Sequence, residues 1–167
     1  MEDIHEIRKR RRTLQETMNF MAALSAGIEP ILGRGANSMT MSAGRNLGRK
    51  FSENATKTDD LLAAVDEVRR VLEENHCLWF FEPFKPKNQP EMIMVNDKGE
   101  REMQIVFKDC MIRQSLFRFG HPQQGSLCNM MYGFFAGALE NIMGKKAKLD
   151  IKHAGENACL KVLTVAS

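Results

Sequence analysis

Two pairs of glycines place the strongest constraint on this fold, because each pair lies inside a segment with the pattern of a helix. Gly133 and Gly137 interrupt the apolar stretch 126–144, and Gly44 and Gly48 interrupt an earlier helical pattern. A glycine in a helix interior costs about 0.5–1 kcal/mol relative to alanine. Residues four apart share one face of a helix. Each predicted helix therefore has one bare face, that is, a face that lacks side chains at two stacked positions. Either close packing or ligand binding must explain this loss.

The bare faces have two possible explanations. Either another backbone packs closely against them, or they leave an open lane beside large apolar neighbours, namely Met130, Phe134 and Phe135 in the later helix and Met41 in the earlier one. Spacing alone favours close packing, because small residues at positions i and i+4 are common where elements touch.

The order of the predicted elements gives the fold class. Apolar periodicity and capping residues predict helices from Thr13 to about Gly27 with a break at Pro30, from Asn37 or Ser38 to about 53, from Asp59 to about 74, and from Ser126 to Gly144. Short β-prone runs predict strands at 78–81, 92–95 and 103–107, and a hairpin of 147–152 with 160–165. Helices and strands do not alternate regularly, so we predict an α+β fold with helices packed on one antiparallel sheet.

Length and charge limit the class of protein. The 167 residues predict one domain, 1–167, with 1–12 as a charged N-terminal extension or helix start. The net charge of +3 is too small to indicate a nucleic-acid partner, although Arg8–Arg12 is an unbroken basic run that is either a solvated helix start or a contact for an acidic surface. No apolar run reaches the roughly 20 residues of a membrane span. We therefore expect a cytoplasmic protein.

Cysteine and methionine content adds two expectations. Cys77, Cys110, Cys128 and Cys159 lack the spacing of a zinc ribbon or a disulfide framework, so we expect free thiols. Twelve methionines favour an adaptable apolar cavity, because methionine is a flexible residue that fills irregular spaces.

Several of these features occur together in a known family. The segment 43–50, Cys128 at the start of a helix with Gly133 and Gly137, and the turn 155–159 before an apolar strand resemble the 4-vinyl reductase domain family. Its members are also described as predicted hydrocarbon-binding proteins, with a fold related to subunits of the TRAPP vesicle-tethering complex. The resemblance implies a domain that binds a hydrophobic small molecule, is often a homodimer, and has an occupied lane beside the glycines.

The chain departs from that family at one cysteine. Family members commonly place a cysteine eight residues before the last one, in a cluster credited with metal or redox roles, and here that position is Ile151. We expect Ile151 to lie opposite Cys159 across the hairpin. The remaining donors Cys128, His153 and Cys159 could form a zinc site with one open position, but they lack local ligand spacing, and structural thiols are favoured.

No motif assigns a catalytic residue or a nucleotide cofactor. His121, in a Gly-His-Pro loop, could serve as a general acid or base, but the sequence places no carboxylate near it. His76 and Cys77 are adjacent, and adjacent side chains on a strand point to opposite faces. Phe117 and Phe119 are better explained as core aromatics than as stacking platforms for bases.

The favoured hypothesis is a binding module, not an enzyme, that acts as a carrier, a sensor or an accessory protein. Its cavity would bind a hydrophobic small molecule mainly through buried apolar area. Two alternatives remain: a reductase or reductase subunit acting on a tetrapyrrole vinyl group with an outside electron donor, and a dimerising interaction protein without ligand. The predicted ligand-binding residues are Met41, Gly44, Gly48, Met130, Gly133, Phe134, Phe135 and Gly137.

Overall fold

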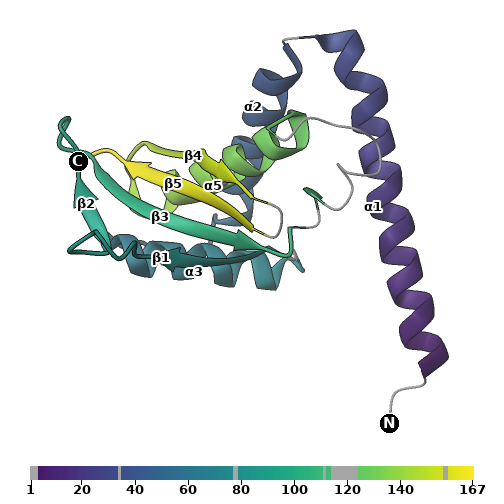
Figure 1. Ribbon diagram of the computed structural model, residues 1–167, viewed down its shortest axis with the longest axis horizontal. Coiled ribbons are helices and arrows are strands. Elements are labelled where there is room, and N and C mark those ends of the chain that lie inside the picture. Colours follow the sequence, from purple (N-terminus) through teal and green to yellow (C-terminus); the bar gives the residue numbers. More distant parts are fainter. Residues whose placement is uncertain (1–3, 34, 77–78, 111, 114–123, 156–157) are drawn as a thin grey trace.

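The chain forms an α+β domain built around one antiparallel sheet, as predicted (Figure 1). The computed structural model describes the chain except residues 1–3, 34, 77–78, 111, 114–123 and 156–157. The strands are β1 (Phe80–Phe84), β2 (Ile93–Val95), β3 (Arg101–Lys108), β4 (Ala147–Ala154) and β5 (Ala158–Val165). They follow the order β1-β3-β5-β4, and β2 also pairs with β3.

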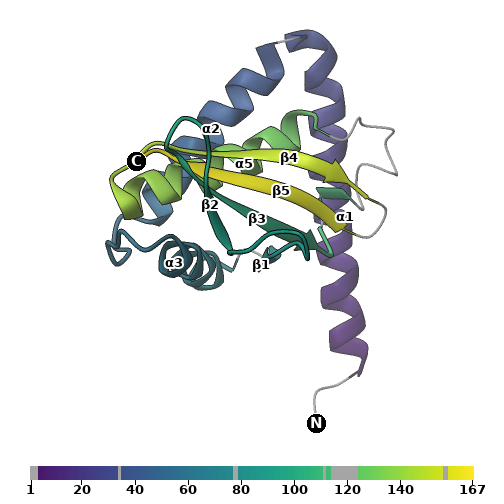
Figure 2. The same cartoon turned by 60° about the vertical axis from the view of Figure 1, so that its left-hand side comes forward.

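Helices of the described residues cover one side of this sheet (Figure 2). Helices α3 (Leu61–Glu74) and α5 (Ser126–Met143) pack next to the sheet, and α2 (Gly35–Phe51) crosses α5. Helix α1 (Ile4–Leu32) contacts α2 and α5, with its Ser25 and Glu29 side chains at the start of α5, and its N-terminal half extends away from the domain (Figure 1).

The predicted start and end of the first helix are wrong. Helix α1 begins about nine residues before Thr13 and continues through Pro30 to Leu32. Thr13 does not act as an N-cap, because its hydroxyl donates to the carbonyl oxygen of Lys9 within the same helix, at 3.1 Å. The side chain of a threonine can satisfy either geometry, so sequence alone did not separate them.

The later helices end close to their predicted positions. Asp60 caps α3 at its start, one residue after the predicted Asp59, because its side chain accepts a hydrogen bond from the backbone N–H of Ala63 at 2.7 Å. Helix α5 ends at Gly144, which has φ of 67° in the left-handed region that favours glycine.

The core lies between the inner face of the sheet and the helices α3 and α5. Alternate residues of the strands, such as Met103, Ile105 and Leu163, are fully buried on this face. Phe107 and Phe135 meet with ring centroids 5.2 Å apart, so the aromatic residues of α5 pack directly on the sheet. No helix among the described residues has the length and hydropathy needed to cross a membrane.

Candidate functional site

The crossing of α2 and α5 explains the four bare glycines. Each glycine faces the main chain of the opposite helix, and a Cβ atom added there would overlap a carbonyl oxygen: Gly44 that of Met130, Gly48 that of Phe134, Gly133 that of Met41, and Gly137 that of Arg45. The open lane implied by the family resemblance is therefore filled by backbone. Close packing, which spacing alone favoured, is what the structure contains.

An ion-pair cluster closes the same crossing at its C-terminal end. The Glu140 carboxylate on α5 accepts from Arg45 and, at 2.8 Å, from Nη2 of Arg49, both on α2. Glu140 is mostly buried, whereas Arg49 is half exposed. The crossing is thus held by backbone contact along the glycine faces and by charge at one end.

The aromatic residues predicted to line a cavity lie in the packed core. Phe134 and Phe135 are buried. Trp79 approaches both, with ring centroids at 5.3 and 6.0 Å, and Phe51 lies 5.6 Å from Phe134. The Phe51–Phe134 and Trp79–Phe134 contacts are edge-to-face and the Trp79–Phe135 contact is stacked, and both arrangements stabilise a core.

An enclosed cavity does occur, at the end of the sheet beneath the first turns of α5. It is lined by Phe107, Cys110, Arg113, Cys128, Met131, Tyr132, Ile151, Cys159 and Lys161. Its volume is about 20 Å³, which is close to the space of one water molecule. We call it the Lys161 chamber.

The lysine of this chamber is a charged residue on the inner face of the sheet. Lys161 pairs with Ile105 and Ile151 in the two neighbouring strands, and only 1% of it is exposed. Its Nζ lies 4.0 Å from the ring centroid of Tyr132 and 4.8 Å from that of Phe107. Burial lowers the pKa of Lys161 to about 8, because the ammonium has exchanged water for aromatic faces.

Tyr132 adds a second polar group to the chamber. Its hydroxyl is buried and has no hydrogen-bond partner within the described part of the chain. Burial raises the pKa of this phenol, which is therefore neutral near pH 7. A buried hydroxyl without a partner costs stability, typically about 1–3 kcal/mol. The chamber thus holds a donor that a bound molecule could satisfy.

Tyr132 also forms the wall between the chamber and the surface. It lines a second, open groove of about 850 Å³, whose other residues include Met41, Ala136 and Leu149. Of the predicted ligand-binding residues, Met41 lies on this groove.

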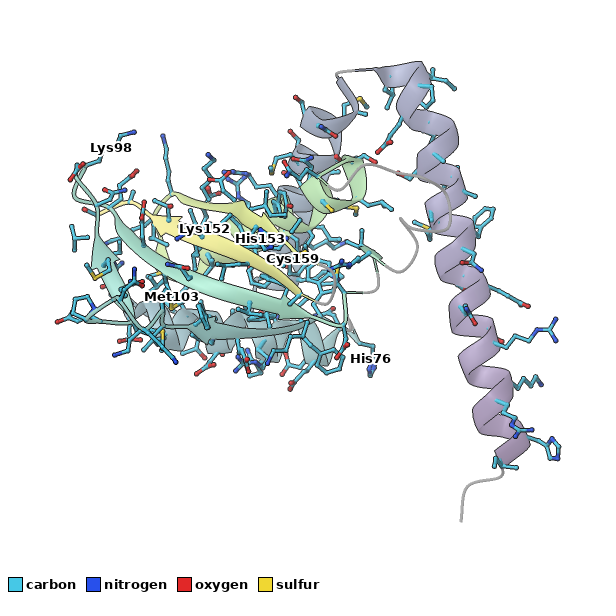
Figure 3. All side chains as sticks on the ribbon, viewed as in Figure 1. His76, Lys98, Met103, Lys152, His153 and Cys159 are labelled. Carbon is cyan, nitrogen blue, oxygen red and sulfur yellow. The ribbon has the colours of Figure 1, made fainter. Side chains whose placement is uncertain are left out.

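The predicted metal ligands are only partly brought together. Cys128 and Cys159 line the chamber, together with Cys110, and burial raises the pKa of the Cys128 thiol. His153 pairs with Leu160, the neighbour of Cys159, and therefore lies on the outer face of the sheet. Figure 3 labels His153 and Cys159 on the two neighbouring strands. Among the described residues, no group of three or more potential ligands surrounds a metal position.

The predicted position of Ile151 is wrong in register. Ile151 pairs with Lys161, and Cys159 pairs with Ala154, because a β-bulge near Lys152 and a tight turn shift the hairpin. Ile151 is nevertheless a wall of the same chamber as Cys159. The residue that sequence reasoning missed is Lys161, although it lies two residues before Leu163 and four before Val165, a spacing that places all three on the inner face.

The other candidates contribute less. His76 lies in a turn with positive φ after α3. Cys77, Phe117, Phe119 and His121 lie outside the described residues.

Comparison with known proteins supports the fold. No protein-family model and no curated protein sequence matches this chain. Among solved structures, it is similar to the crystal structure of the phenol-responsive sensory domain of the transcription activator PoxR with phenol, with a TM-score of 0.65 and 17% sequence identity. The match covers 89% of this chain and 73% of that chain. The neighbour is a small-molecule sensory domain, and what the similarity shows for this chain is the fold.

Proposed function

We propose that this domain binds a small hydrophobic molecule carrying one polar group, and that the molecule occupies an enlarged Lys161 chamber. The observation that carries the proposal is the buried pair of Lys161 and Tyr132 in an enclosure that Phe107, Met131 and Ile151 make mainly apolar and to which the buried Arg113 adds a second cation. A few polar groups in an apolar pocket are the usual arrangement of a small-molecule site, where they fix the orientation of the ligand.

The charges of the chamber indicate the chemistry of the polar group. The Lys161 ammonium can donate hydrogen bonds and forms no ion pair with a carboxylate in the described part of the chain, where the Tyr132 hydroxyl is likewise a donor without a partner. Both favour an acceptor or an acidic hydroxyl on the ligand. Phenol combines an aromatic ring with one acidic hydroxyl, and the structural neighbour is a crystal structure with phenol.

Binding requires the chamber to open. A cavity of roughly 150 Å³ binds benzene in a protein core, whereas this chamber has about 20 Å³. Rotation of Tyr132 toward the surface groove would supply the missing space without disturbing the α2–α5 crossing. A ligand that moves a wall residue in this way changes the surface of the domain, which favours a sensor over a passive carrier.

The test is calorimetry with phenol and with toluene, which share an aromatic ring but differ in the hydroxyl. We expect the wild-type protein to bind phenol more tightly, and Lys161→Met to lose at least tenfold in phenol affinity while toluene binding changes little. Lys152→Met is the matched control, because Lys152 lies on the same hairpin, is exposed, and is labelled on the outer side in Figure 3. Absence of any binding, or equal losses in both lysine variants, would contradict the proposal.

The reductase alternative stays a prediction. Its test is turnover of a tetrapyrrole vinyl substrate with a reduced electron donor. Turnover that survives in Lys161→Met would favour a site elsewhere in the protein.

A further inference from the structure

The buried amine of Lys161 has a chemical property that recognition by hydrogen bonds does not use. An amine is a nucleophile only when it carries no extra proton, and a lysine at the surface is almost fully protonated near neutral pH. Lys161 is 1% exposed, and burial lowers its pKa to about 8. At pH 7 about one tenth of the Lys161 side chains are then free amines, compared with about one in 2,500 for an ordinary lysine.

The surroundings of Nζ leave the lone pair of this amine available. Nζ lies 4.0 Å from the ring centroid of Tyr132 and 4.8 Å from that of Phe107. Lys161 forms no ion pair with a carboxylate in the part of the chain that the structure describes, and such a partner would have held the proton on Nζ. The titratable groups that line the chamber with it are Tyr132 and Cys128 of α5, Cys159 of β5, and Cys110 and Arg113, which follow β3.

A lysine at this position is costly unless its amine is used. The neighbours of Lys161 in the adjacent strands are Ile105 and Ile151, so an apolar side chain would suit the position. A permanent cation is already present, because the buried Arg113 lines the same chamber and does not lose its proton. Groups that reduce stability are characteristic of functional sites. What Lys161 adds to the chamber, and an arginine cannot, is a free amine.

We propose that Lys161 forms an imine with an aldehyde ligand, so that the chamber binds an aromatic aldehyde covalently and reversibly. This inference rests on the proposed function, because it assigns the polar group of the same hydrophobic ligand. The lone pair of Nζ attacks the carbonyl carbon, and the carbonyl oxygen leaves as water with the two protons of the amine. A C=N bond replaces the C=O bond, and the step needs no oxidant or reductant.

Other groups of the chamber suit this step. The Tyr132 hydroxyl is neutral, buried and without a hydrogen-bond partner among the described residues, so it can donate to the carbonyl oxygen and polarise it. Burial raises the pKa of the Cys128 thiol, and a protonated thiol is a weak nucleophile that does not compete with the amine. The enclosure also excludes bulk water, which would hydrolyse the imine.

Imine formation removes a buried charge. An aromatic imine is a weaker base than the amine from which it forms, so the product is neutral under conditions in which the unliganded lysine is mostly an ammonium. The unfavourable burial of that ammonium is therefore relieved when the aldehyde binds. An exposed lysine such as Lys152 has no such penalty to lose. The fold thus favours the covalent product at Lys161 over the same product at the surface.

Reductive trapping of the full chain with benzaldehyde and sodium cyanoborohydride tests this proposal. The reagent reduces the imine to a stable benzylamine, and peptide mass mapping then locates each modified lysine. At pH 7 we expect Lys161 to be labelled at least tenfold faster than Lys152, the exposed lysine of the same hairpin. This ratio should fall at least fivefold between pH 7 and 9.5, because exposed lysines gain free amine throughout this range while Lys161 gains little above its pKa of about 8.

Competition connects the adduct to the chamber. Excess phenol should slow the labelling of Lys161 at least fivefold and leave that of Lys152 unchanged, because both molecules occupy the same enclosure. Equal labelling of the two lysines at pH 7 would overturn the imine. Absence of a Lys161 adduct in a protein that binds phenol by calorimetry would also overturn it, and would leave the proposed function standing. A protein that neither forms the adduct nor binds phenol would contradict both proposals.

Discussion

Helices α2 and α1 both pack small residues against α5, yet they place their large residues in opposite directions. Along α2, Gly44 and Gly48 touch the backbone of α5, while Leu47 and Phe51 pack against the core. Along α1, Ala22 contacts the domain, while the large apolar residues point away from it. Small residues therefore let a helix approach closely, but they bury little area. The stability of α2 comes from its flanking residues, and α1 lacks that contribution within one chain.

The largest test of this difference substitutes one glycine from each region. Gly137→Ala places a Cβ against the carbonyl of Arg45, so the helices must separate, and we expect a loss of more than ~3 kcal/mol or failure to fold. Gly27→Ala in α1 meets no atom within 4 Å and should stabilise by about 0.5–1 kcal/mol. Urea denaturation measures both. If Gly137→Ala left the stability unchanged, α2 and α5 would have unfilled space between them, and that result would favour the open lane beside the glycines.

The Lys161 chamber differs from the α2–α5 crossing because it includes a costly group. The folded-state pKa of Lys161, about 8, lies below the unfolded value of about 10.4, so the folded protein loses its proton first. The unfavourable effect of this burial is complete below pH 8 and fades as pH rises toward 10.5.

Lys161→Met should therefore be more stable than wild type by about 2–3 kcal/mol at pH 7, with the gap closing by pH 10.5. Urea unfolding at pH 7, 8.5 and 10 measures it. Lys152→Met is the control and should show no such closing gap. A constant difference at all three pH values would mean that folding does not change the pKa of Lys161.

Part of this structure follows from local sequence signals. The end of α5 was predictable because Gly144 supplies the left-handed residue of a C-cap, and the elements themselves follow from periodicity. The bare faces of the glycines were also visible in their spacing. What fills such a face is a contact between residues about 90 positions apart, which no local pattern records. The bulge near Lys152 likewise depends on strand pairing, so the opposition of Ile151 and Cys159 was mispredicted.

Lys161 shows a different reason for failure. The two-residue period of β5 predicts that the Lys161 side chain lies on the inner face of the sheet. A lysine in a strand is, however, ordinarily assigned to the solvent face. Only the rings of Tyr132 and Phe107, brought from α5 and β3, make the inner position tolerable. Functional groups that violate a local rule are the ones that sequence reasoning assigns to the wrong environment.

A substitution on the body face of α1 tests its contact with the domain. Ala22 is fully buried, so Ala22→Leu should overpack the contact and cost about 1–3 kcal/mol. Leu24→Ser, two residues away on the outer face, should leave the stability of the monomer within about 0.5 kcal/mol. Thermal unfolding at 1 µM compares the two. Equal losses would mean that the outer face already packs against the same chain.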